Sequence, residues 1–420
     1  MSNNVRNFQD DCKSKVRLGF IGLSGRGKSL LGTVLAMADV DVPAVSELYE
    51  DRLQLGIEQV EASGRHRPEG YKDYRKLLER DDIDGVVIAT SWTTHTEIAI
   101  DAMKAGKYVG MEVGGATSIK DCWDLIRTSE TTGMPCMMLE NCNYGREEMA
   151  ILNMVKKNVL GEIIHCQCGY QHDLREEVAC GIENRHYRIH NYLNRNGDVY
   201  PTHGLGPMAK FLNINRGNRF ISLTSMASKS RGINEWVKNN KGEDHPLARA
   251  DFALGDVITT MLKCAHGETV LIIHDTSLPR PYSRGGRVQG TKGIWMEDNK
   301  SIYIEGRSPG HTWEPFENYL KEYEHPLWKE YLNLGVQGGH GGMDYLVLRA
   351  YIESIKANTD TPIDVYDTAT WMAVTALSEQ SIATGSSVVA FPDFTNGKWI
   401  NRKPGFPGKY SLDNVYDNLF

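Results

Sequence analysis

The stretch that decides the fold reads Val16-Arg-Leu-Gly-Phe-Ile-Gly-Leu-Ser-Gly-Arg-Gly-Lys-Ser29. Residues 16–21 form an apolar run that predicts a strand, the glycines predict a turn, and a helical pattern begins at Ser29. A glycine-rich turn between a strand and a helix lets backbone N–H groups and a helix N-terminus approach a pyrophosphate. The glycines are spaced Gly22-x-x-Gly25-x-Gly27, and Ser24 stands where the common pattern has its middle glycine. We expect Gly22, Ser24 and Gly25 to bind a cofactor phosphate; a plain strand-to-helix connection is the alternative.

An acidic residue, Glu47, ends the second predicted strand at 42–47. A carboxylate at this place accepts both ribose hydroxyls of NAD and repels the 2′-phosphate of NADP. Arg26 acts in the opposite sense, because a nearby arginine can pair with that phosphate. The sequence therefore favours NAD. A solvated charge at a strand end is the alternative interpretation of Glu47.

Apolar runs alternate with helical patterns through the first third of the chain. The expected strands are 16–21, 42–47, 85–89, 108–112 and 136–139, and the expected helices are 29–38, 95–105 and 119–131. This alternation predicts an α/β fold with a doubly wound parallel sheet and helices on both faces. Ligands bind at the carboxyl edge of such a sheet. Polar and aromatic segments follow its third, fourth and fifth strands at 89–95, 110–115 and 140–144.

The pattern changes after about residue 145. A helix at 146–159 and a strand at 162–169 precede a polar stretch, 170–203, and the other expected strands are 219–228, 252–264, 268–276, 286–296 and 300–305. Successive strands with glycine-rich turns predict an antiparallel sheet, closed by helices at 343–357 and 365–384. We therefore expect an N-terminal domain (1–143), an α+β domain (144–390) and a tail packed on the surface (391–420).

Composition narrows the class of protein. The formal net charge is −7, which argues against a nucleic-acid surface. No apolar run reaches the roughly 20 residues that span a bilayer, and residues 1–8 lack the pattern of a secretory signal, so we expect a cytoplasmic protein without a membrane partner. The eight cysteines include no C-x-x-C pair. We expect free thiols and no metal site.

Several longer motifs carry a resemblance. They are Glu112-Val113, Met137-Met-Leu-Glu-Asn-Cys142, Cys168-Gly-Tyr170-x-His-Asp-Leu-Arg175, Tyr200-x-Thr-His203-Gly-Leu-Gly-Pro-Met208 and Gly338-Gly-His-Gly-Gly-Met-Asp344. With them the chain resembles glycoside hydrolase family 109, the NAD-dependent α-N-acetylgalactosaminidases. That group lies within the larger family of glucose–fructose oxidoreductase and inositol dehydrogenase. The resemblance implies an N-terminal Rossmann domain followed by an α+β domain with an open antiparallel sheet.

The resemblance also implies site residues. The implied cofactor contacts are Gly25, Arg26, Glu47, Trp92, His95, Glu112, Val113 and Asn141. The implied substrate contacts are Tyr170, Arg188, Tyr200, Thr202, His203 and Tyr282. Most dehydrogenases of the larger family carry Glu-Lys-Pro after the fourth strand, and the lysine helps to move the substrate proton. This chain has Glu112-Val113-Gly114 instead, which argues against a simple dehydrogenase.

The family's cycle oxidises the sugar at C3, eliminates the group at C1, adds water and returns the hydride, so that no net redox change occurs. It needs groups that move protons near neutral pH. Histidine suits this task, and a tyrosine can act where its surroundings lower its pKa. Tyr200 and His203 precede a predicted helical run, 208–213, and in its first turn both would point to one side. We expect His203, Tyr200 and Tyr170 to be catalytic, with the division between C2 and C3 left open.

Two other functions remain as alternatives. One is an NAD-dependent sugar dehydrogenase with net hydride transfer, and the other is a non-catalytic protein that senses a sugar or a nucleotide. In each case the expected ligand is a small sugar or glycan. Because open sheets in this family commonly pair, the expected assembly is a homodimer.

Overall fold

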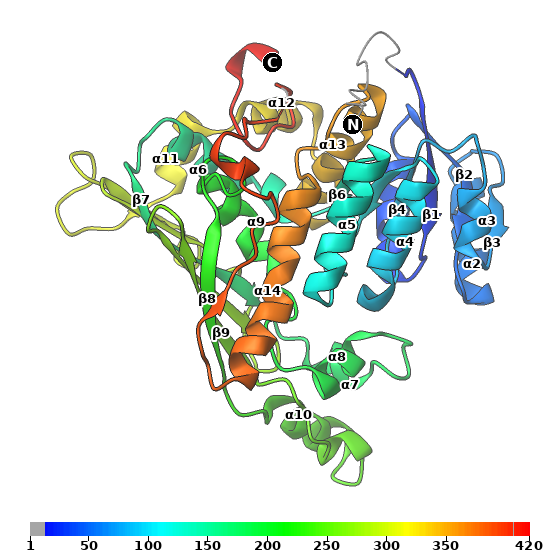
Figure 1. The fold of residues 1–420 in the computed structure, drawn as a ribbon, viewed down its shortest axis with the longest axis horizontal. Coiled ribbons are helices and arrows are strands. Elements are labelled where there is room, and N and C mark those ends of the chain that lie inside the picture. Colours follow the sequence, from blue (N-terminus) through cyan, green and yellow to red (C-terminus); the bar gives the residue numbers. More distant parts are fainter. Residues whose placement is uncertain (1–12, 406) are drawn as a thin grey trace.

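The computed structural model describes residues 13–405 and 407–420 and contains two sheets (Figure 1). Cys12 and the segment in which we expected no secretory signal lie outside the described residues. The parallel sheet lies toward the N-terminal, blue part of the ribbon, and the larger sheet lies on the opposite side. In the described part of the chain, no helix is both long and apolar enough to cross a membrane.

The first sheet has six parallel strands in the order β3-β2-β1-β4-β5-β6. They are β1 (Val16–Ile21), β2 (Val40–Ser46), β3 (Glu69–Tyr71), β4 (Gly85–Ile88), β5 (Tyr108–Met111) and β6 (Cys136–Met138). Apart from β3, which is short and mostly exposed, each matches a predicted apolar run because each is buried on both faces. The order reverses between β1 and β4, and ligands bind at this point in doubly wound sheets.

Helices cover both faces of the parallel sheet. They include α1 (Gly25–Leu35), α2 (Glu50–Ala62), α3 (Tyr74–Leu78), α4 (Trp92–Lys104), α5 (Ile119–Thr132) and, from far along the chain, α13 (Met343–Lys356). Tyr351 of α13 places its hydroxyl 3.0 Å from the Val86 carbonyl oxygen and 2.9 Å from that of Tyr108. A Cβ at Gly85 would lie 2.5 Å from this hydroxyl, so the glycine makes room for it. Helix α13, from the second half of the sequence, therefore completes the helices that cover the parallel sheet.

The second sheet has nine strands in the order β14-β13-β12-β11-β7-β10-β9-β8-β15. They are β7 (Ile163–Gln171), β8 (Phe220–Ala227), β9 (Val257–Cys264), β10 (Thr269–Asp275), β11 (Arg287–Gly290), β12 (Gly293–Met296), β13 (Ser301–Ile304), β14 (Glu314–Pro315) and β15 (Val389–Ala390). The sheet is mixed, because β7 and β10 pair in parallel while the other pairs are antiparallel. The predicted strand 286–296 is a hairpin of β11 and β12, since residues 291 and 292 form its turn.

One face of the second sheet is covered and the other is open. Along β9, Ile258, Thr260 and Leu262 are buried, while the intervening Met261 is exposed. The covering helices include α6 (Arg146–Lys156), α9 (Thr202–Phe211) and α14 (Val365–Ala383), and α14 runs alongside β8 (Figure 1). Helix α9 begins six residues before the run predicted at 208–213, so that prediction was wrong at its start.

The remaining elements surround the site and the tail. They are α7 (Arg175–Ala179), α8 (Arg188–Asn194), α10 (Gly232–Lys241), α11 (Glu317–Tyr323), α12 (Pro326–Leu334) and the 3-10 helices η1 (Asn141–Tyr144), η2 (Pro246–Ala248), η3 (His340–Gly342), η4 (Lys398–Ile400) and η5 (Asp417–Leu419). The tail, expected on the surface, also buries Phe391, Phe394 and Leu412 in the main core. The boundaries predicted at 143 and 390 remain a prediction.

Candidate active site

The glycine-rich turn fits a bound dinucleotide. Gly22 has a φ of +94°, and a Cβ there would lie 2.6 Å from the Ala89 carbonyl carbon. A Cβ at Gly27 would lie only 2.0 Å from the Gly22 oxygen, so the start of α1 crosses the strand closely. At Gly25, by contrast, a Cβ would meet no atom within 4 Å, and Ser24 makes no side-chain bond to the helix. The turn therefore presents open space and helix amides to a phosphate.

Glu47 lies directly after β2 and faces this turn. Its side chain is buried, and Oε2 accepts a hydrogen bond of 2.8 Å from the Leu23 N–H. Oε1 accepts a second one of 3.1 Å from the Tyr49 N–H. A carboxylate offers about four lone pairs, so two bonds leave it able to accept ribose hydroxyls. The placement matches that expected from the sequence.

Arg26 is held by two carboxylates rather than left free. Its Nε donates to Glu112 Oε1 at 2.8 Å, and its two terminal nitrogens donate to both oxygens of Asp344 at 2.7 and 2.9 Å. Burial alone would lower the pKa of Arg26, but Glu112 and Asp344 raise it above its ordinary value. Asn141 also donates to Asp344, at 2.8 Å. Arg26 and Asn141 therefore meet at the Asp344 carboxylate, and Glu112 joins the group through Arg26.

Asp344 itself was absent from the residues predicted for the site. It lies in the first turn of α13, is fully buried and has Oδ2 2.8 Å from His340 Nδ1. Burial alone would raise the pKa of Asp344, whereas His340 and Arg26 lower it. Its signal in the sequence was the glycine-rich stretch 338–344, but no spacing rule connects that stretch to a turn more than 300 residues earlier.

The segment after β4 supplies Trp92 and His95, and the segment after β5 supplies Val113. The His95 ring is buried between two backbone carbonyls, with Nε2 3.0 Å from the Thr90 oxygen and Nδ1 3.3 Å from the Gly114 oxygen. Burial lowers the pKa of His95, although the two carbonyl oxygens oppose the shift. His95 thus links the two loops, and Val113 lies buried beside them.

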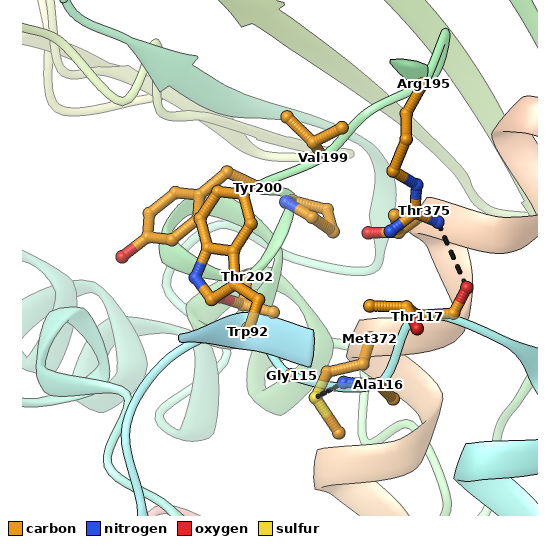
Figure 2. Close-up of a pocket in the computed structure, with 12 residues that line it drawn as sticks. Trp92, Gly115, Ala116, Thr117, Arg195, Val199, Tyr200, Thr202, Met372 and Thr375 are labelled. Carbon is orange, nitrogen blue, oxygen red and sulfur yellow. Dashed lines mark hydrogen bonds between the residues drawn. The ribbon is translucent and has the colours of Figure 1, made fainter. Parts of the chain in front are cut away.

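A small pocket lies where these loops meet the chain before α9. Figure 2 shows the Trp92 indole lying against the Tyr200 ring, with Thr202 beneath them. Ring centroids of Trp92 and Tyr200 are 5.4 Å apart in a stacked arrangement. On the far side of the pocket, Arg195 donates to the Thr117 carbonyl oxygen at 3.0 Å (Figure 2). The edge of the parallel sheet therefore touches the predicted substrate residues directly.

Aromatic rings surround one guanidinium. Arg188 begins α8 and is buried, with its guanidinium carbon 5.1 Å from the Trp92 ring, 4.9 Å from the Tyr200 ring and 6.0 Å from the Tyr170 ring. Its Nε lies 2.8 Å from a carboxylate oxygen of Glu177, another residue missing from the prediction. Arg188 Nη1 has no hydrogen-bond partner in the described part of the chain. A buried guanidinium N–H without a partner is suited to bind a polar ligand.

The tyrosines and His203 form one cluster. Ring centroids of Tyr170 and Tyr200 lie 4.5 Å apart, and those of Tyr200 and His203 lie 4.9 Å apart. The Tyr200 hydroxyl oxygen is 3.4 Å from His203 Nε2, and His203 Nδ1 is 2.7 Å from Glu140 Oε1. Tyr282, which is 46% exposed, stands at the rim with its ring 6.1 Å from that of Tyr170.

The surroundings raise the pKa of both predicted catalytic tyrosines. Burial raises the pKa of Tyr200 well above its ordinary value, and the neighbouring Tyr170 and Glu112 add to the rise. Burial also raises the pKa of Tyr170, although Arg188 opposes the rise. Both phenols therefore hold their protons near neutral pH. Such a tyrosine moves a proton by donating it to a neighbouring base, and the base beside Tyr200 is His203.

Comparison with known proteins gives the family context. Residues 144–401 match the model of the glycosyl hydrolase 109 C-terminal domain, and residues 16–140 match that of the oxidoreductase family NAD-binding Rossmann fold. A glycosyl hydrolase family 109 protein of Stenotrophomonas maltophilia is 46% identical, covering 94% of this chain and 93% of its own length. An alpha-N-acetylgalactosaminidase of Tannerella forsythia is 43% identical, covering 93% and 88%.

Among solved structures, a levoglucosan dehydrogenase in complex with NADH and L-sorbose has a TM-score of 0.70 at 18% identity. The alignment covers 91% of this chain and all of that one. At this identity the likeness concerns the fold. It agrees with the predicted arrangement of a Rossmann sheet followed by an α+β domain with a second, largely antiparallel sheet.

Proposed function

The chain belongs to glycoside hydrolase family 109, and from that premise we propose that it hydrolyses terminal α-linked N-acetylgalactosaminides with bound NAD and no net redox change. The substrate is taken from relatives such as the alpha-N-acetylgalactosaminidase of Tannerella forsythia. One observation carries the proposal. The Trp92–Tyr200 stack, with ring centroids 5.4 Å apart, supports it because Trp92 follows a strand of the parallel sheet and Tyr200 belongs to the cluster with Tyr170 and His203.

When bound, NAD supplies a reversible hydride acceptor for C3 of the sugar, and the resulting ketone acidifies the proton at C2. The electrons balance because the hydride that leaves C3 returns to C3 at the end of the cycle. The atoms balance because the C1 substituent leaves with the C2 proton as an alcohol, and one water replaces both. The net reaction is hydrolysis.

The chain's own residues move the protons. Tyr200 and His203 serve C3 and C2: the Tyr200 hydroxyl lies 3.4 Å from His203 Nε2, so a proton taken from the sugar passes between them. Tyr170 bonds to His172 Nδ1 at 3.0 Å and serves C1 or C2. Arg188, with a free N–H inside the aromatic ring cluster, orients the sugar. Thr202 and Tyr282 contribute further contacts, Tyr282 from the rim.

NAD is preferred over NADP for an electrostatic reason. Glu47 faces the turn, and the guanidinium of Arg26 forms ion pairs with both Glu112 and Asp344. Three carboxylates against one guanidinium disfavour a 2′-phosphate. We also infer a homodimer that pairs through the open face of the second sheet, where Ile221, Met226 and Met261 are exposed.

A sugar dehydrogenase is the second candidate. Buried Val113 stands where most dehydrogenases of the larger family have a lysine, which favours the glycosidase. A non-catalytic sensor is the third candidate, but a sensor has no need of a histidine held between a tyrosine hydroxyl and a buried carboxylate.

The test follows one reaction by two signals. Purified protein is mixed with nitrophenyl α-N-acetylgalactosaminide and NAD, and nitrophenol release and NADH absorbance are recorded together. We expect many turnovers of nitrophenol without accumulation of NADH. NADH that rises in step with substrate consumption would establish the dehydrogenase instead. Binding of the sugar without turnover in either signal, on this substrate and a panel of other glycosides, would establish the sensor.

A further inference from the structure

We propose that Glu140 is a positioning residue for the reaction proposed above: it holds the His203 proton on Nδ1, so that Nε2 is the base that faces Tyr200 and the sugar. The proposal rests on the proposed function for its kinetic consequences. Its structural content, the tautomer of one histidine, is independent of turnover.

The backbone brings Glu140 and His203 together from positions 63 residues apart. Glu140 follows β6 as the cap of η1, and its Oε1 also accepts from the Cys142 N–H at 3.2 Å. Helix α9 lies close over it because Gly206 has no side chain: a Cβ there would lie 3.1 Å from Glu140 Cγ and 2.6 Å from Asn143 Nδ2. Gly204 permits the same close approach of α9 to β7, where a Cβ would lie 2.5 Å from the Gly169 nitrogen.

Among the residues that the structure describes, the ionic partner of the Glu140 carboxylate is His203. The side chain is fully buried, and its Oε2 has no hydrogen-bond partner in the described part of the chain. Burial alone would raise the pKa of Glu140, but His203 lowers it below its ordinary value. A buried carboxylate is stable only with a paired donor. The donor available at 2.7 Å is the Nδ1–H of His203.

Fixing one nitrogen defines the role of the other. A neutral imidazole carries its proton on one nitrogen and accepts at the other. With Nδ1–H bonded to Glu140, the lone pair of Nε2 points to the Tyr200 hydroxyl, 3.4 Å away. When Nε2 takes a proton, the carboxylate stabilises the imidazolium, as an orienting carboxylate does in a hydrolase triad. The titratable groups around the pair are Tyr200, Tyr170, His172 and Cys142.

A metal ion is the competing explanation, because Glu140, Cys142 and His203 have ligand atoms within 4.8 Å of one another. An ion between Glu140 and His203 would lie about 2.0–2.2 Å from each atom. The direct contact of 2.7 Å between Nδ1 and Oε1 is instead that of a hydrogen bond. The geometry therefore favours the proton over the ion.

The first test reads the tautomer without turnover. In the full-length protein labelled with ¹⁵N-histidine, long-range ¹H–¹⁵N spectra distinguish Nδ1–H from Nε2–H, and the His203 signal is assigned by its loss in His203→Ala. We expect the Nδ1–H form in the wild type and a mixed or reversed form in Glu140→Gln. An Nε2–H form in the wild type, or an unchanged signal in Glu140→Gln, would overturn the proposal. One bound metal ion per chain by elemental analysis, lost in Glu140→Gln, would also overturn it.

The second test is kinetic. Glu140→Gln should lower kcat about 10- to 100-fold with KM changed less than threefold, and the acid limb of the pH profile should move to lower pH because the imidazolium loses its anion. Glu140→Asp, which keeps the charge, should recover part of the rate, and exposed Glu243→Gln should match the wild type. Equal kcat and pH profile in Glu140→Gln would contradict the role. If the wild type itself turns over no glycoside, the proposed function fails, and the spectra still decide the tautomer.

Discussion

Helix α9 carries a buried charge cluster at each end, and the two clusters are built differently. At its last turn, Lys210 pairs with Asp367 at 2.7 Å and Asp413 at 3.0 Å, and Arg216 pairs with Asp364, Asp367 and Asp413 at 2.6 to 2.8 Å. At its first turn, His203 pairs with Glu140, and Glu140 Oε2 has no hydrogen-bond partner among residues 13–405 and 407–420.

This difference in partners distinguishes a charge cluster that stabilises the fold from one that we propose acts in catalysis. In the C-terminal cluster each charge meets at least one opposite charge, and a cation near a helix C-terminus is favourable in itself. Such a cluster joins α9, α14 and the tail. In the N-terminal cluster the Tyr200 hydroxyl, His203 Nε2 and Arg188 Nη1 retain capacity to bond. A substrate that enters the neighbouring pocket can form the hydrogen bonds that these groups still lack.

The largest effect is expected from a substitution in the cluster at the N-terminal end of α9. His203→Ala should lower turnover of an aryl α-N-acetylgalactosaminide about 10²- to 10⁴-fold, because the proton acceptor for Tyr200 is lost. The melting temperature should fall as well, because the buried Glu140 carboxylate loses its donor, so the rate is compared per folded molecule. Nitrophenol release measures the rate, and exposed His66→Ala is the control. Wild-type turnover in His203→Ala would remove histidine from the mechanism.

The next largest effect is expected from a substitution in the cluster at the C-terminal end of α9. Asp367→Asn should lower the free energy of unfolding by about 3–5 kcal/mol, because Lys210 and Arg216 lose a shared buried partner. The rate per folded molecule should stay near that of the wild type. Urea unfolding measures the loss against the exposed control Asp244→Asn. A large loss of rate at full folding would mean that the two ends of α9 are coupled.

A smaller effect is expected on how the free energy of unfolding depends on pH, and it concerns Asp413 of the C-terminal cluster. Burial alone would raise the pKa of Asp413, but Lys210 and Arg216 lower it. A carboxyl with a depressed folded pKa stabilises fully above its unfolded value of about 3.9, and the contribution is lost as pH falls below that. Unfolding free energies measured by urea from pH 7 to pH 3 should therefore fall less steeply in Asp413→Asn, by up to about 1.4 kcal/mol per pH unit. Parallel curves would show that Asp413 titrates normally.

The smallest effect concerns a third cluster, Arg26–Glu112–Asp344. Asp344→Asn should weaken retention of NAD about tenfold, because Arg26 loses its bidentate partner beside the glycine-rich turn. Bound NAD per chain after gel filtration measures this, with Asp244→Asn again as the control. Unchanged retention together with a lower unfolding free energy would place this cluster with the structural end of α9.

Much of the fold could be predicted from the sequence because its signals are local. The strand 16–21 and the helix 365–384 were predicted to within a residue, since one is a buried apolar run and the other has a strong N-cap at Asp364. The parallel pairing of β7 with β10 could not be predicted, because nothing local specifies which distant strand becomes a neighbour. The hairpin 287–296 was predicted as one strand, although Gly290-Thr-Lys-Gly293 in its middle is a turn signal.

The candidate site also contains residues that the sequence identified and a residue whose role it did not reveal. Motif resemblance identified Tyr170, Arg188, Tyr200 and His203, and the structure brings all four within a few ångströms of one another. Whether each acts as predicted is for the experiments above to decide. Glu140 lay inside a quoted motif but had no predicted role, because its partner lies 63 residues away.

By itself, the sequence determined the glycine-rich turn, the parallel sheet, the family and the side chains present at the candidate site. These follow from periodicity, glycine placement and motif identity, which are properties of neighbouring residues. Only the tertiary structure decided how those side chains are charged and oriented. Burial keeps the protons on Tyr170 and Tyr200, Gly206 lets α9 lie against Glu140, and Asp344 from α13 occupies Arg26. Desolvation and close packing depend on atoms that are distant in sequence, so they exist only once the chain has folded.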